Sequence, residues 1–197
     1  MRLTWLGHAT FLLETTDGIR IVTDPVDEES GYPFAPVACD LVTVSHQHHD
    51  HNALHRVSPN AKAMQTTGRM QYRTVTVTGY PTWHDEQNGA LRGNNIVFVI
   101  EAEGKRIVHL GDLGHMLPQE LMKTLRYSDV LLIPVGGTYT LDGRQAAALA
   151  DRLQAKRTIA MHYQTEHLTF PLSGAEPFLE SVHVPAEALR VGETVEF

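Results

Sequence analysis

The sequence predicts one α/β or α+β domain spanning residues 1–197, and three observations support this. Short β-rich runs dominate the first half of the chain. In the second half, expected helices lie between apolar strands, a pattern typical of covered sheets. Polar residues also follow several apolar strands directly, where strand ends meet at one rim of a sheet. The length of 197 residues and the 42% hydrophobic content fit a globular domain with a sizeable core.

The individual elements follow from apolar runs bounded by Gly, Pro, Asn or Asp. Strands are expected at 2–6, 11–15, 20–23, 41–45, 73–79, 95–101, 106–110, 130–135 and 158–161, with a last strand at 189–197 that is interrupted at Gly192. Residues 28–36 are polar and rich in Gly and Pro, so they predict a loop. Helices are expected at 50–57, 118–126 and 141–154, with Asp50 near the first N-cap and Thr140 or Asp142 capping the last.

Composition and charge indicate which binding partners and which cellular compartment to expect. The formal net charge is −7 with only 16 Lys and Arg, which disfavours nucleic-acid binding. The single cysteine, Cys39, rules out an intrachain disulfide and favours a reducing compartment. Without a signal-like or membrane-spanning apolar run, we expect a cytoplasmic protein with a small-molecule substrate and no integral membrane contact. The sequence leaves open whether the protein forms a homo-oligomer. Three residues of the early loop could lie at a subunit contact or over the pocket, namely Pro33, Phe34 and Pro36.

The run S-H-Q-H-H-D-H at 45–51 is the most informative motif in the chain. Imidazole nitrogens and carboxylate oxygens are good ligands for zinc, at about 2.0–2.2 Å. In an extended loop His46 and His48 point to one position, whereas Asp50 and His51 reach a second position a few Å away. The motif therefore predicts two metal ions. The competing interpretation is a solvated, His-rich surface loop.

Further candidate residues follow strands downstream and upstream of this run. His84 comes after an expected strand, and His162 ends the run T-I-A-M-H. Asp112 follows Gly111, which lets the backbone approach closely, so its carboxylate can bridge two cations. The alternatives are a packed histidine for His84 and an ordinary turn residue for Asp112. Asp24 is interpreted either as an acceptor for a ligand imidazole or as a simple Asp-Pro turn.

These motifs, in this order, resemble the metallo-β-lactamase superfamily of dinuclear hydrolases. More narrowly, the chain is similar to the small branch that includes ascorbate-6-phosphate lactonase and phospholipase D-type members. The shared motifs are L-G-H-A-T at 6–10, T-D-P at 23–25, W-H-D at 83–85, R-G-N at 92–94, P-V-G-G at 134–137 and M-H-Y at 161–163. The resemblance covers residues 3–197. It implies a four-layer αββα sandwich, with the metals at one rim.

The resemblance also implies a ligand set. One metal is assigned to His46, His48 and His84, and the other to Asp50, His51 and His162, with Asp112 as the bridge. Two divalent ions are expected, Zn²⁺ first and Mn²⁺ next, with Fe or Ni also compatible with these donors. The implied reaction uses a metal-bound hydroxide, with Asp50 as the catalytic residue that orients it and passes its proton onward.

The leading functional hypothesis is a dinuclear hydrolase of a small ester, lactone, amide or phosphodiester. A mononuclear iron oxidoreductase of the persulfide dioxygenase type is the alternative, because it shares H-x-H-x-D-H and the fold but uses fewer of these ligands. A non-enzymatic metal-binding module is the third class. Arg92, Tyr139, Tyr163 and His115 are the candidates for substrate binding.

The remaining histidines divide by position. We expect His49 to face away from the metals, so that His49→Ala has a mild effect, and His109 to be buried under the site. His8 is interpreted either as a residue of the rim or as a packing residue.

Overall fold

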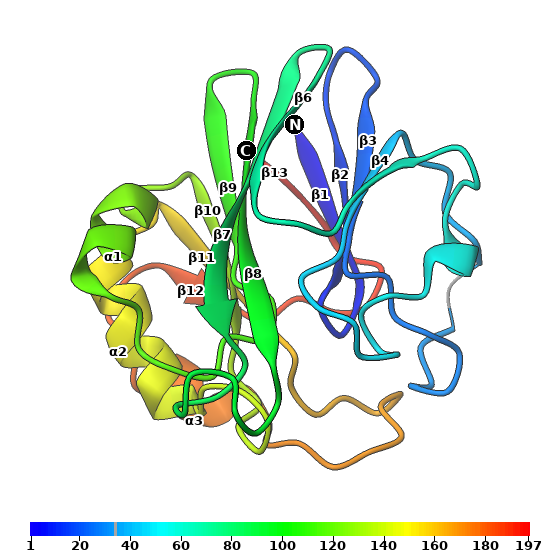
Figure 1. Cartoon of the computed structure of the whole chain (residues 1–197). Helices are drawn as coiled ribbons and strands as arrows, with labels where there is room; N and C mark the ends of the chain where they lie inside the picture. The colour runs from blue at the N-terminus through cyan, green and yellow to red at the C-terminus, as the bar shows by residue number, and fades with distance from the viewer. Residues whose placement is uncertain (34) are drawn as a thin grey trace.

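Two β-sheets face each other in the computed structural model, which describes residues 1–33 and 35–197 (Figure 1). The expectation for Phe34 lies outside the described residues. In spatial order, the first sheet contains β13 (Thr194–Glu196), β1 (Arg2–Gly7), β2 (Thr10–Glu14), β3 (Arg20–Thr23), β4 (Leu41–Thr43) and β5 (Lys62–Met64). The second contains β12 (Ala186–Glu187), β11 (Arg157–Met161), β10 (Val130–Pro134), β9 (Lys105–His109), β8 (Asn94–Ala102), β7 (Val75–Trp83) and β6 (Gly68–Tyr72).

The main core fills the space between the two sheets. Successive side chains of a strand point to opposite faces of its sheet. In β2, Phe11 and Leu13 therefore belong to the main core, whereas Leu12 packs in a smaller cluster on the outer face. In β3, Ile21 likewise belongs to the main core and Val22 to the outer cluster. Because both faces of the sheet are covered at β2, β3 and β4, these strands are buried almost throughout, whereas β1 and β13 alternate between buried and more exposed residues.

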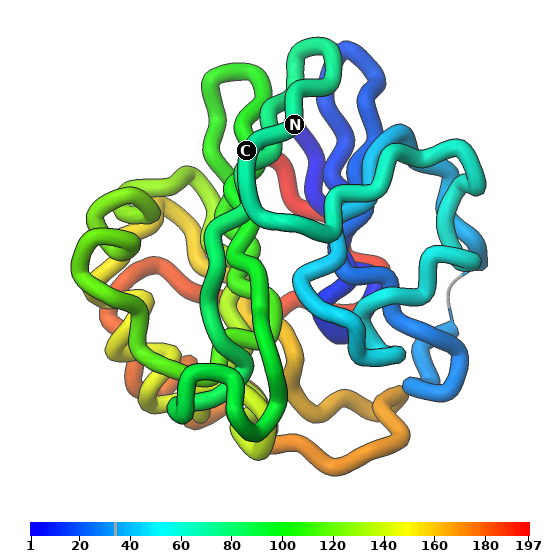
Figure 2. Tube along the Cα trace, viewed as in Figure 1, coloured from blue at the N-terminus to red at the C-terminus, as the bar shows by residue number. Residues whose placement is uncertain are grey.

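The helices α1 (Gln119–Leu125), α2 (Gly143–Leu153) and α3 (Glu176–Leu179) lie together on the outer face of the second sheet (Figures 1 and 2). Asp142, rather than Thr140, caps α2: its carboxylate accepts a hydrogen bond from the Gln145 backbone, and the Gln145 side chain returns one to Asp142. The buried face of α2 includes Ala146, Ala150 and Leu153. Within residues 1–33 and 35–197, no helix has the length and apolar character needed to cross a bilayer.

Three sequence-based expectations about elements are wrong. The segment 50–57 contains only the 3₁₀ helix η1 (Leu54–Arg56). Asp50 bonds His8 instead of capping a helix, and the N–H of Ala53 donates to the carbonyl of Pro25. The last strand starts only at Thr194, since Gly192 has a φ of 84° and its N–H donates to the carbonyl of Trp5 in a turn. Expected strand 41–45 ends at Thr43. The short elements β5, β6, β12 and α3 were not predicted.

The expected convergence of strand ends is confirmed. Asp24 directly follows β3, His84 follows β7 and His162 follows β11. His46 lies three positions after the end of β4, and Asp112 three positions after β9. Sheet topology brings these ends to one rim, where the two sheets meet.

Candidate metal centre

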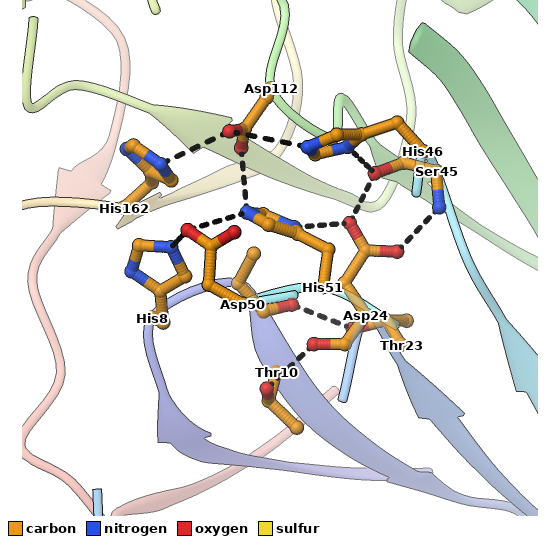
Figure 3. A network of polar contacts seen from close by, with 12 residues as sticks. His8, Thr10, Thr23, Asp24, Ser45, His46, Asp50, His51, Asp112 and His162 are labelled. Atoms are coloured by element: carbon orange, nitrogen blue, oxygen red, sulfur yellow. Dashed lines mark hydrogen bonds and ion pairs between the residues drawn. The ribbon is translucent and has the colours of Figure 1, made fainter. Parts of the chain in front are cut away.

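The Asp112 carboxylate lies at the centre of this rim and is approached by four imidazoles. Its Oδ2 is 3.1 Å from Nε2 of His84 and 3.1 Å from Nε2 of His162. Its Oδ1 is 3.2 Å from Nε2 of His51, and Nε2 of His46 lies 3.7 Å from Oδ2. Asp112 and these imidazoles are buried (Figure 3 shows all of them except His84).

The described residues contain four clusters of possible donors, and within each cluster the donor atoms lie within 4.8 Å of one another. One cluster joins Asp24 to His46 and His51, and another contains Asp27, Glu29 and His49. The other two clusters contain only predicted ligand residues and His8, and they form the two groups described next. The first group contains His46, His48 and His84, and the second contains His8, Asp50, His51 and His162. Asp112 contacts members of both groups. The structure thus places all the predicted ligand residues together. It adds His8, for which the sequence left two interpretations open.

This donor set fits divalent cations. Nε2 of His46 and Nε2 of His51 are buried and have no well-aligned hydrogen bond among the described residues. Buried polar atoms normally have a partner, and a cation bound by imidazole nitrogen would supply one. Burial, assisted by His51, lowers the pKa of His46 to about 3, so its ring is neutral and able to bind metal near pH 7.

The ionisation of Asp112 and of the second group is also suited to binding a cation. Burial alone would raise the pKa of Asp112, but His162 and His51 hold this pKa well below its usual range. Burial would lower the pKa of His51, but the carboxylates of Asp112 and Asp50 raise it well above its usual value. A buried proton on His51 therefore compensates these carboxylates, and a bound cation would take its place.

Asp24 lies below predicted ligand residues of both groups and bonds them directly or through Ser45 (Figure 3). Its Oδ2 accepts a hydrogen bond from Nδ1 of His51 at 2.9 Å, and its Oδ1 accepts one from the Ser45 backbone at 2.8 Å. The Ser45 hydroxyl donates to Oδ2 of Asp24 at 2.5 Å and lies 2.9 Å from Nδ1 of His46. Of the two interpretations of Asp24, the structure shows the acceptor, since Asp24 bonds the imidazole of the predicted ligand His51.

We expect Asp24→Asn to weaken metal binding by about 10- to 100-fold, the usual effect of losing an outer partner of a ligand imidazole. Competition with a chromophoric chelator measures this affinity. Asp27→Asn is the matched control, because Asp27 also accepts a hydrogen bond from an imidazole of the same loop, that of His49, at 2.7 Å. Equal affinities of the two variants would contradict the role of Asp24.

The backbone at the rim is strained. Three non-glycine residues that carry site side chains have left-handed φ angles, namely His8 (51°), Asp24 (35°) and His162 (52°). Such conformations cost about 1–3 kcal/mol each and persist where the surroundings enforce them, often at functional sites.

Gly111 has a φ of 56°, and a Cβ there would lie 2.4 Å from Oδ1 of Asn95. That oxygen accepts the N–H of Asp112, so Gly111 permits the contact that fixes the central carboxylate.

A cavity of about 370 Å³ opens on the two groups. Among its lining residues are His48, Asp50, Arg92, Tyr139 and Phe170. The guanidinium of Arg92 lies over the Tyr139 ring, 4.5 Å from its centroid. A second cavity of about 560 Å³ adjoins the first and shares His48 and Arg92 with it.

Two of the four candidate substrate residues do not reach the metal-facing cavity. The hydroxyl of Tyr163 donates to the carbonyl of Leu189, and its buried ring stacks on Trp5. Nε2 of His115 accepts the N–H of Trp83. Neither residue is among those that line either cavity.

Sequence reasoning missed the residue that shapes the loop carrying Arg92. The carboxylate of Asp85 accepts hydrogen bonds from the backbone N–H groups of Gln87, Gly89, Leu91 and Arg92. An aspartate before a polar, Gly-containing stretch is a signal that could have identified it, because Asp side chains accept hydrogen bonds from nearby backbone N–H groups in turns. Phe170 comes from an irregular segment, and no periodic pattern marked it.

The other histidines lie largely as expected. Nε2 of His109 is buried and bonds the carbonyl of Ala9, beneath the site. His49 is exposed and bonds Asp27, but it also lines the cavity that opens on the two groups, which the sequence did not predict. Neither contacts Asp112 among the described interactions.

Two facing mixed sheets, with histidines and aspartates gathered at one rim, define the metallo-β-lactamase fold class. Residues 2–162 match the model of the family described as the Beta-lactamase superfamily domain. The chain belongs to this family, and the predicted family and fold class are confirmed.

Relatives of known sequence or structure agree with this placement. The chain is 31% identical to a UPF0173 metal-dependent hydrolase of Archaeoglobus fulgidus, across 100% of this chain and 99% of that protein. A solved structure from Thermotoga maritima, described as a candidate zinc-dependent hydrolase of the metallo-β-lactamase superfamily, shares 44% identity with a TM-score of 0.76, over 91% of this chain and 84% of that one. Igni18, a metallo hydrolase from Ignicoccus hospitalis, shares the fold at 23% identity, with a TM-score of 0.75 over 100% and 98% of the two chains.

Proposed function

We propose that this protein is a dinuclear metal-dependent hydrolase. The observation that supports two ions is the position of Asp112, whose carboxylate contacts imidazoles of both donor groups at 3.1–3.7 Å. His46, His48 and His84 would hold one ion, and Asp50, His51 and His162 the other, with Asp112 shared. The names of the relatives support the hydrolase class.

The chemistry divides between the ions and the chain. When bound, two divalent ions would lower the pKa of a water from 15.7 to about 7 and would polarise the oxygen under attack. Zn²⁺ is the first expectation and Mn²⁺ the second, because His and Asp donors suit both. Asp50 lines the cavity, and among the described residues only one of its oxygens is hydrogen-bonded. The other oxygen is available to orient the attacking water and accept its proton.

The substrate is a small ester, lactone, amide or phosphodiester with a nearby anionic group. The chain carries a net charge of −7, yet a guanidinium stands at the boundary of the two cavities. Arg92 can bind a carboxylate or phosphate through two parallel hydrogen bonds. Tyr139 and Phe170, whose rings lie 6.4 Å apart, form an aromatic wall beside it. This cavity therefore favours a substrate with an apolar part and one negative charge.

We expect Arg92→Ala to raise KM by about 10- to 100-fold for an anionic substrate, because a hydrogen bond to a charged group contributes about 1.5–3 kcal/mol. A neutral analogue of the same size should be affected little. Steady-state kinetics on the matched pair measures this difference. Arg92→Lys is the control, since it keeps the charge but not the planar fork. Equal losses for both substrates would show that Arg92 only supports its loop.

Elemental analysis of the purified protein, paired with assays on lactone and phosphodiester model substrates, tests the proposed function. About two equivalents of zinc or manganese, with turnover that is lost on chelation, is the expected result. One equivalent of iron without hydrolysis would overturn it. Oxygen uptake with a persulfide donor would then identify the oxidoreductase class instead.

A further inference from the structure

His8 lies in the turn between β1 and β2 and is fully buried against the second donor group. Its Nε2 is 3.1 Å from Oδ2 of Asp50, and this contact joins residues 42 positions apart (Figure 3). Its ring centroid is 4.2 Å from that of His162 and 5.0 Å from that of His51. His8 therefore touches every other member of that group.

The backbone of His8 is fastened at the same place. Its carbonyl accepts hydrogen bonds from the Trp5 indole at 3.0 Å and from the His162 backbone at 3.2 Å. The preceding Gly7 packs directly against the Tyr32 ring, which a Cβ would approach to 2.1 Å. These contacts fix the turn in place. Through the turn, His8 links the backbone of one expected ligand, His162, to the side chain of another, Asp50.

The two nitrogens of the His8 ring have different environments. Nε2 bonds Asp50, whereas Nδ1 is buried and has no hydrogen-bond partner among the described residues. Since a carboxylate only accepts, Nε2 carries the proton and donates it to Oδ2. This bond restricts rotation of the Asp50 carboxylate and leaves Oδ1 for the cavity side.

We propose that His8 is a positioning residue that sets the affinity of the second metal position by holding Asp50 and His162 in place. The proposal rests on the dinuclear function proposed above. Partners of this kind usually change metal affinity by about 10- to 100-fold when they are lost. The first metal position should be insensitive, because His8 belongs to the second donor group and not to the first.

Two amide substitutions separate this role from a purely structural one. The amide of His8→Gln extends about as far as Nε2 and can donate to Asp50. The amide of His8→Asn extends only about as far as Nδ1, where the structure offers no partner. Asparagine adopts left-handed backbone more readily than glutamine, and His8 has a φ of 51°. If His8 has only a structural role, His8→Asn should retain more of the affinity for the second metal ion than His8→Gln. If His8 positions Asp50, His8→Gln should retain more of it.

The experiment is calorimetric titration of each metal-free protein with Zn²⁺, with thermal melting as a check on folding. In His8→Asn we expect the second binding event to weaken by about 10- to 100-fold, with the first unchanged. In His8→Gln the second event should stay within a few-fold of wild type. The affinity ratio of the two events within one variant is an internal control against general damage to the fold.

Three results would overturn the role of His8. These are two intact binding events in His8→Asn, weakening of both events together, and equal loss of the second event in the two variants. The last result is expected if His8 is itself a ligand. A wild-type protein that binds one ion would instead overturn the dinuclear proposal, so the two failures are distinguishable.

Discussion

Asp112→Ala should abolish turnover, with a fall in kcat/KM of about a thousandfold or more. Its carboxylate is the group shared between the two donor sets, so the variant loses a ligand of both proposed ions. Metal activation of water and substrate contributes several kcal/mol, and about 4 kcal/mol corresponds to a thousandfold in rate. Bound metal should fall from two equivalents to one or fewer.

Metal analysis and kinetics on the same preparation test this expectation. His49→Ala is the matched control, because His49 lies in the same motif and lines the same cavity, but its exposed ring bonds Asp27 rather than Asp112. That variant should keep two ions and most of the activity. If His49→Ala lost more activity than Asp112→Ala, the ligand assignment would be wrong.

Removing the metals should cost about 4 kcal/mol of folding stability. A ligand that binds only the folded state stabilises it by about that amount when its free concentration is a thousand times Kd. Without ions, neighbouring imidazoles are what compensates the buried carboxylate of Asp112 among residues 1–33 and 35–197. A buried ionic cluster with one component missing is strongly destabilised. Activity should disappear with the metals.

Thermal melting with and without a chelator measures this change, and added Zn²⁺ or Mn²⁺ should restore both stability and turnover. The raised pKa of His51 adds a pH dependence with a defined sign. Metal must displace the proton of His51, so metal affinity increases with pH until that proton is lost from the free site. The difference between the two melting curves should thus be larger at pH 8 than at pH 6, at equal free metal. A difference that shrank with pH would argue against His51 as a ligand.

The donor residues were predictable because their signal is local. His46, His48, Asp50 and His51 stand within one short run, and a residue's capacity to bind metal depends on its type. Asp24, His84 and His162 directly follow strands, and strand ends converge at a rim. The expected helix at 50–57 failed for a non-local reason, because the bond between His8 and Asp50 competes with a helix cap.

Substrate residues were harder to predict, since their orientation depends on packing. Tyr163 and Tyr139 are equally plausible in the sequence, yet the hydroxyl of Tyr163 bonds the carbonyl of Leu189 while Tyr139 lines the cavity. Arg92 reaches the cavity from a loop that Asp85 shapes through four backbone hydrogen bonds.

Residue type and order, through the family resemblance they carry, were enough to predict the family, the fold class and a set of candidate donor side chains. These properties depend on side-chain chemistry and on neighbours close in the chain. The sequence offered Asp112 as a bridge and Asp24 as an acceptor beside other interpretations, and tertiary structure decided between them; it alone showed that His8 contacts Asp50. Each of these contacts joins segments far apart in the sequence. Their geometry depends on how two sheets pack, which no local pattern encodes.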